Sequence, residues 1–187
     1  RTHPEDFARV KKYLDNMTQS ALDLSHSYQD IKAHSYRIGE SFVSVDMRQL
    51  VEAAVDQVAG SAGDRPVDVA NVPAVILQAQ PRRLALAIEI ILRFRLAQLP
   101  AGQRLRLCSE WQPDADQIKF WTVDAGPMFG NDVLKDALNE FSRPYHFELV
   151  LARKILARHG GSIILQNDNG QARLEFYLNP RHYTRHV

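Results

Sequence analysis

The sequence has a single cysteine, almost no net charge and no long apolar run, and each absence excludes a class of protein. One cysteine, Cys108, cannot build a disulfide framework, and no Cys/His spacing indicates a zinc site. Cys108 falls in an alternating run, where a buried structural thiol is a better interpretation than a nucleophile. Basic and acidic residues number 23 and 22, and they form neither the basic block expected of a nucleic-acid groove nor an acidic tail. We therefore expect no metal and no nucleic acid.

No stretch approaches the roughly 18 consecutive apolar residues of a membrane span, and the N-terminus lacks the apolar core of a signal peptide. We expect no membrane segment in this chain and a cytoplasmic location, with the sequence cut from a longer protein as an open alternative. The 187 residues are 45% hydrophobic, which suffices for the core of one ordinary domain plus a helical extension.

Glycine and proline are both missing between Glu5 and Arg37, which predicts one long helix. Pro4 suits its start and Gly39 its end. Apolar residues recur in steps that alternate three and four, and this 3.5-residue repeat is typical of a helix packed on another long helix. The expected seam comprises Phe7, Val10, Leu14, Met17, Ala21, Leu24, Tyr28 and Ile31.

Residues 1–40 are therefore predicted to be a dimerisation helix. Such a helix would extend roughly 50 Å at 1.5 Å per residue, which is longer than the remaining domain is wide. The alternative, a terminal helix folded back on its own domain, stays open.

Residues 41–187 alternate helical and strand patterns, which predicts an α+β fold. A short strand leads to Asp46 as the N-cap of a helix, and Gly160–Gly161 has the usual chemistry of a helix C-cap. Asn169–Gly170 predicts a hairpin turn between the last two strands. The order is strand, helix, two strands, helix, two strands, helix, two strands. We expect a two-layer sandwich in which three helices cover one face of a mixed, mostly antiparallel sheet.

The order of these elements, together with the segments "ALDLSHSYQDIKAHSYRIGE", "VDMRQLVEAAVDQV" and "LARKILARHGGSIILQN", resembles the core of a sensor histidine kinase. The resemblance covers nearly the whole chain. It implies that residues 1–40 are the second dimerisation helix and residues 41–187 an ATPase-like domain of the fold shared with gyrase, Hsp90 and MutL proteins. The first helix, which carries the phosphorylated histidine in that family, would precede Arg1.

The metal-binding positions of the family are replaced in this sequence. The pattern L-x-x-x-L-x-N-L-L-x-N-A, aligned on Leu84, places Ile90 and Phe94 at the two asparagines that the family uses around Mg²⁺. Neither side chain offers the hard oxygen ligand that magnesium prefers. The nearby Arg93 and Arg95 would bring the wrong charge to a metal, although either could meet a phosphate.

The base-binding pattern D-x-G-x-G survives in part. Asp124 and Gly126 match the Asp that accepts a hydrogen bond from adenine and the Gly that lets the chain pass close to the base. Met128 replaces the second Gly, and we expect its side chain to fill the cavity. Asp124 and Gly126 are thus predicted to be the remnant of a nucleotide pocket.

The phosphate-binding turn G-x-G-L-G aligns with residues 146–149, where His146 and Glu148 replace the decisive glycines. Glycine N–H groups at a helix start normally hold phosphate, whereas Glu148 brings a negative charge there. We expect Glu148 to stabilise the helix N-terminus instead. The lid is short, because Phe141, the expected lid anchor, lies close to that turn.

These departures predict a degenerate sensor histidine kinase core, without catalytic residues and without a cofactor. It would act in two-component or phosphorelay signalling as a homodimer that contacts a response regulator receiver domain, a partner kinase or a phosphotransfer protein. The first alternative is an active histidine autokinase with an atypical site, which would use ATP and Mg²⁺. The second alternative is a purely structural dimerisation domain. His26 and His34 are interpreted as ordinary residues of the long helix, with a phosphoacceptor role as the alternative for His26 because a neighbouring acid could orient its imidazole. His159 is interpreted as a helix-capping residue.

Overall fold

The computed structural model of the chain describes residues 11, 13, 40–62, 67–139 and 147–179. The chain divides into residues 1–40 and residues 41–187. In the first unit, Lys11 and Tyr13 are helical. The predicted seam and the histidines His26 and His34 otherwise lie outside the described residues, so the dimerisation helix stays a prediction.

The second unit contains a five-stranded sheet in the order β2-β4-β5-β7-β6. Only β2 and β4 are parallel; the other neighbours are antiparallel. The strands are β2 (Val67–Ala70), β4 (Leu105–Gln112), β5 (Gln117–Val123), β6 (Ser162–Asp168) and β7 (Gln171–Leu178). The predicted α+β class with a mixed, mostly antiparallel sheet is confirmed.

One detail of the sheet differs from the prediction. β1 (Val43–Asp46) and β3 (Ile76–Ala79) do not join the large sheet but form a separate antiparallel pair. Both strands are four residues long, and both lie at the start of a helix. Their hydrogen bonding therefore fixes the entry into the two helices rather than extending the sheet.

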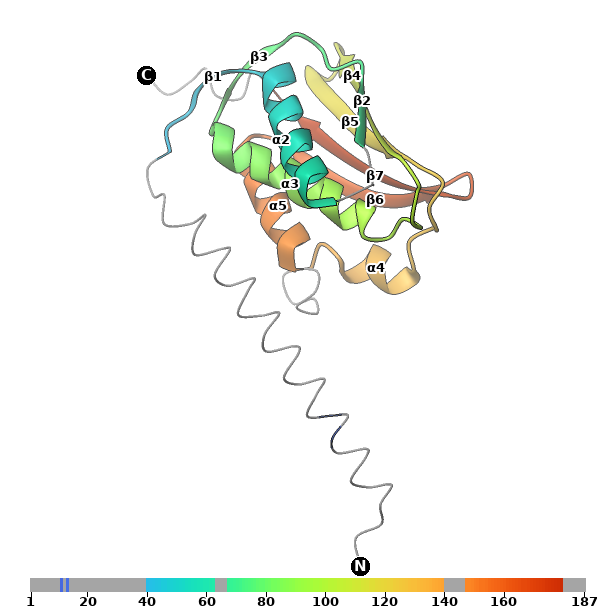
Figure 1. Cartoon of the computed structure of the whole chain (residues 1–187). Helices are drawn as coiled ribbons and strands as arrows, with labels where there is room; N and C mark the ends of the chain where they lie inside the picture. Colours follow the sequence, from blue (N-terminus) through green and yellow to red (C-terminus); the bar gives the residue numbers. More distant parts are fainter. Residues whose placement is uncertain (1–10, 12, 14–39, 63–66, 140–146, 180–187) are drawn as a thin grey trace, which may run out of the picture. The chain divides into compact units, whose positions relative to one another are not determined.

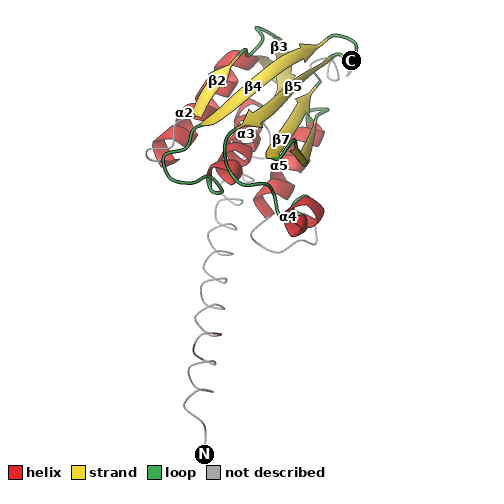
Figure 2. Cartoon of the chain, turned by 90° about the vertical axis from the view of Figure 1, so that its right-hand side faces the viewer, coloured by secondary structure: helices red, strands yellow, loops and turns green. Residues whose placement is uncertain are grey.

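Three helices cover one face of the large sheet, while no described helix lies over the other face (Figures 1 and 2). The helices are α2 (Met47–Ala62), α3 (Pro81–Leu96) and α5 (Phe147–Arg158). Alternate residues of each strand point toward them, as the pleat of a strand requires. Phe120 of β5 and Phe176 of β7 are paired across the two strands, fully buried, with stacked rings 4.6 Å apart.

The local signals predicted from the sequence are present. Asp46 Oδ1 accepts a hydrogen bond from Arg48 N–H at 2.8 Å, which caps α2. Gly160 has φ of 70°, and Gly161 N–H donates to Leu156 C=O at 2.8 Å, which completes a Schellman C-cap of α5. Asn169 and Gly170, with φ of 49° and 80°, turn the last hairpin.

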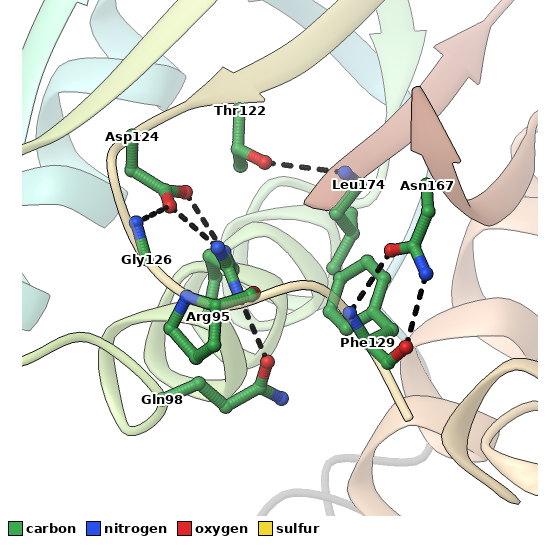
Figure 3. Close-up of polar contacts among 9 residues, drawn as sticks. Arg95, Gln98, Thr122, Asp124, Gly126, Phe129, Asn167 and Leu174 are labelled. Carbon is green, nitrogen blue, oxygen red and sulfur yellow. Dashed lines mark hydrogen bonds and ion pairs between the residues drawn. The ribbon is translucent and has the colours of Figure 1, made fainter. Parts of the chain in front are cut away.

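The chain leaves the sheet at the end of β5 and reaches the short helix α4 (Asn131–Asp136) through residues 124–130. This connection passes the C-terminal turn of α3 (Figure 3). The candidate site lies where the two segments meet.

Candidate functional site

Arg95 lies in the last turn of α3, on the face that packs into the core. Leu84, Ile88 and Ile91 occupy the same buried face at helical spacing, so Arg95 continues an apolar stripe. Its side chain has no solvent exposure. A buried guanidinium needs a partner of opposite charge and acceptors for its N–H groups.

Asp124, the residue after β5, supplies that partner (Figure 3). Arg95 Nε donates to Asp124 Oδ2 at 2.8 Å, and Nη2 donates to Oδ1. Oδ1 also accepts from Gly126 N–H at 2.8 Å. The Asp124 side chain is fully buried, and both of its oxygens accept hydrogen bonds from within the chain.

The remaining groups around the Arg95 guanidinium are also complementary to it. Nη1 donates to Gln98 Oε1 at 3.0 Å and to Pro127 C=O at 3.2 Å. The guanidinium carbon lies 5.2 Å from the centre of the Phe129 ring, within the range of a cation–π contact. Carboxylate, amide oxygen, carbonyl and aromatic face thus surround a single planar cation.

Gly126 is required by this packing. A Cβ at this position would clash with the Leu99 side chain and would lie 2.8 Å from Arg95 Nη2. Its backbone does not adopt positive φ. The retained glycine is therefore explained by close approach to the Arg95–Asp124 pair.

Asn167 of β6 fixes the far end of the connection. Its side chain accepts from Phe129 N–H at 2.9 Å and donates to Phe129 C=O at 3.0 Å. The Phe129 ring stacks on Phe94 of α3 with ring centres 6.2 Å apart. The segment is thereby held closed over Arg95 from both ends.

Ile90 and Phe94, where the sequence analysis expected the metal-binding asparagines to be replaced, contribute packing. Ile90 is buried at 6% exposure and belongs to the hydrophobic core. Phe94 packs against that core and against Phe129. Neither presents an oxygen, and no cluster of three or more His, Cys, Asp or Glu suited to a metal occurs within the described residues.

The expectation that Met128 fills the cavity is wrong, because its side chain is 56% exposed. Phe129, the next residue, is buried at 4% exposure, and its ring takes the inward position. The double hydrogen bond of Asn167 to Phe129 fixes which of the two neighbours points inward.

Two other residues singled out from the sequence, Glu148 and Arg93, are exposed. Glu148 is exposed in the first turn of α5. Arg93 is half-exposed and pairs with Glu89 at 2.7 Å along the helix surface. His146 and Phe141 fall outside the described residues.

His159 connects the end of α5 to the start of α3. It is buried at 2% exposure, and Nε2 accepts from Gln80 N–H at 3.0 Å. Nδ1 must then carry the proton of the neutral ring, and it donates to Ile155 C=O at 2.8 Å. His159 thus satisfies a late carbonyl of its helix, as predicted, and in addition joins two helices.

A second polar cluster lies on the sheet face that no described helix covers. Lys119 Nζ lies 2.9 Å from Glu175 Oε1, Tyr177 OH donates to Glu175 Oε2, and Lys119 lies over the rings of Trp121 and Tyr177. Burial alone would raise the pKa of Glu175, but the hydrogen bond from Tyr177 and the Lys119 ammonium lower it overall. On the same face, burial raises the pKa of the half-buried Cys108 thiol, which argues against a nucleophile.

The pairing of Arg95 with Asp124 escaped the sequence analysis. The signal that could have revealed Arg95 is its position on an apolar helical stripe, where a charged residue must have a buried partner. Asp124 is 29 residues away, and no local pattern links the two.

Comparisons with known proteins agree with this fold. No protein-family model and no curated protein sequence matches the chain. Among solved structures, the nucleotide-free catalytic domain of the histidine kinase ThkA matches with a TM-score of 0.63 at 14% identity, over 74% of this chain and 96% of that one. The mycobacterial sensor histidine kinase MprB matches with a TM-score of 0.63 at 17% identity, over 75% and 98%.

The ATP-binding domain of PrrB from Mycobacterium tuberculosis matches with a TM-score of 0.58 at 22% identity, over 75% of this chain and 98% of that chain. The described domain therefore has the fold of the catalytic domains of histidine kinases. The part of the chain that the structure describes contains no helix of sufficient length and apolar character to cross a bilayer.

Proposed function

We propose that this chain is a degenerate sensor histidine kinase core that acts in two-component signalling through dimerisation and protein contacts, without useful ATP binding. The observation that carries the proposal is the Arg95 guanidinium on the Asp124 carboxylate. In histidine kinases that carboxylate accepts the adenine amino group, and here it accepts two hydrogen bonds from Arg95 and one from Gly126.

Binding of adenine at Asp124 would first have to break this pair. Removing one partner of a buried ion pair costs about 3–5 kcal/mol, which corresponds to a loss of about two to three and a half orders of magnitude in affinity. Ile90 and Phe94 offer no ligand to the Mg²⁺ that would offset this cost. The occupied Asp124 carboxylate and the missing metal ligands at Ile90 and Phe94 are thus two independent obstacles to nucleotide binding.

The retained fold is consistent with a role in protein contacts. The partners we propose are a second copy of this chain through residues 1–40, and a response regulator receiver domain, a partner kinase or a phosphotransfer protein. The module would work in the cytoplasm, either alone or as part of a longer sensor. Its histidine kinase fold explains why a scaffold without a usable nucleotide site would still recognise proteins of a phosphorelay.

Titration calorimetry of the 187-residue chain with ATP and Mg²⁺ tests the proposal. We expect no binding at sub-millimolar nucleotide, whereas an active histidine kinase catalytic domain titrated in parallel gives a normal isotherm. Micromolar, Mg²⁺-dependent affinity would contradict the proposal and favour the alternative of an atypical autokinase.

A further inference from the structure

We infer that Asp124, Pro127, Gln98 and Phe129 form a guanidinium-binding site whose resident ligand is the side chain of Arg95. The inference rests on the same Arg95–Asp124 pair as the proposed function but concerns which chemical group the residues around Arg95 recognise. The four residues come from the segment after β5 and from the end of α3, and all of them contact the guanidinium group.

The polar atoms that face the ligand are all acceptors. Both Asp124 oxygens, the Pro127 carbonyl and Gln98 Oε1 receive N–H groups from Arg95. A guanidinium has only donors, five N–H groups in one plane, and matches such a set. A purine amino group lies beside ring nitrogens that are acceptors, and these would face other acceptors here.

The shape of the site also favours a flat cation. The two Arg95 donors meet the two Asp124 oxygens side by side, and the Phe129 ring lies 5.2 Å from the guanidinium carbon. An ammonium ion has the charge but not the planar fork. The site is therefore selective for a guanidinium or amidinium group.

The site lies close to the surface although Arg95 itself is buried. Gln98 is half-buried and Met128, next to Pro127, is exposed. Truncation of Arg95 would leave an opening lined by Asp124, Pro127 and Phe129 that a small free cation can enter. Methylguanidinium matches the end of the missing side chain.

Thermal unfolding of Arg95→Ala with and without methylguanidinium tests this site. We expect the variant to lose roughly 10 °C in Tm, because a buried carboxylate is left unpaired. Low millimolar methylguanidinium should recover about half or more of that loss, saturably, as a ligand of the native state does. The matched control Arg93→Ala, on the exposed side of the same helix, should show neither loss nor recovery.

Two further ligands define the specificity. Tetramethylammonium, a cation without N–H donors, should give no recovery with Arg95→Ala. Adenosine should give none either. Recovery by tetramethylammonium would overturn the inference, because it would show that any small cation stabilises the variant. Recovery by adenosine alone would overturn it as well, because the ligand of the site would then not be a guanidinium.

A measurement on the unmodified chain covers the case in which Arg95→Ala does not fold. In ¹⁵N NMR spectra the Nε–H of Arg95 should exchange slowly with solvent, and that of Arg93 quickly. Rapid exchange at Arg95 would overturn the inference. If ATP and Mg²⁺ bound tightly while the Nε–H of Arg95 stayed protected, the proposed function would fail and the guanidinium site would stand. If neither nucleotide binding nor recovery by methylguanidinium were seen, the guanidinium site would fail and the proposed function would stand.

Discussion

Two cation–carboxylate pairs lie on opposite sides of β5, and they differ in how far water reaches them. On the helix side, the side chains of Arg95 and Asp124 are both fully buried. On the open side, the side chains of Lys119 and Glu175 are 22% and 4% exposed, and aromatic rings flank the lysine. The charges are alike, but only the outer pair retains contact with solvent.

This difference determines what each pair can tolerate. A fully buried ion is tolerated only while its partner is present, because loss of the partner leaves a desolvated charge without a counter-charge. The outer pair can respond to pH, since protonation of Glu175 leaves Lys119 with access to water. The inner pair is therefore structural, whereas the outer pair is a titratable part of the surface.

The largest effect is expected from Asp124→Ala. The change leaves the Arg95 guanidinium buried without a counter-charge and removes the acceptor of Gly126 N–H, so the free energy of unfolding should fall by about 3–5 kcal/mol. Urea denaturation followed by circular dichroism measures the loss.

The double variant Arg95→Met/Asp124→Ala is the informative partner of that experiment. It removes both charges and should recover much of the stability, because an apolar side chain of similar length suits the site. Glu89→Ala, which breaks the surface pair with Arg93, should cost about 0.5 kcal/mol or less. Equal losses in Asp124→Ala and Glu89→Ala would contradict the burial assigned to the inner pair.

A smaller effect is expected from Gly126→Ala. The added Cβ would overlap Leu99 and press on Arg95, which should destabilise the fold by about 1–3 kcal/mol. Gly60→Ala is the matched control, because it lies in α2 with no atom within 4 Å of an added Cβ. That control should be neutral or stabilising by up to about 1 kcal/mol. If both substitutions were neutral, the close packing at the Arg95–Asp124 pair would be refuted.

The sequence predicted the fold well because its signals are local. Asp46 caps a helix, Gly160 ends one, and Asn169–Gly170 turns a hairpin through contacts within a few residues of each position. Strand alternation likewise reflects immediate neighbours. The separate pairing of β1 with β3 was missed, since strand partners are chosen by tertiary contacts rather than by either strand alone.

The site was predictable only in part, for the same reason. The resemblance directed attention to Asp124 and Gly126, whose role as the remnant of a nucleotide pocket stays a prediction, as does the loss of a metal at Ile90 and Phe94. The side chains buried beside Asp124 were not predicted: Met128 was expected to be buried there, while Arg95 and Phe129 are. Which side chain fills a cavity depends on contacts between distant segments, such as the Asn167 clamp on Phe129.

The smallest effect concerns the outer pair and depends on pH. Because the pKa of Glu175 is lower in the folded chain than its ordinary value of 4.5, its ionised form stabilises the fold above that value. This contribution is lost as the pH falls through the folded pKa. Glu175→Gln should therefore cost about 1–2 kcal/mol at neutral pH and progressively less below pH 4.5.

Urea midpoints of both proteins between neutral and acidic pH measure this convergence. Glu52→Gln, at an exposed carboxylate on α2, is the control and should change stability little at any pH. A difference between wild type and Glu175→Gln that stays constant into acid would mean that the cluster acts through packing rather than charge. The outer pair would then differ from the inner pair only in how far its side chains are buried.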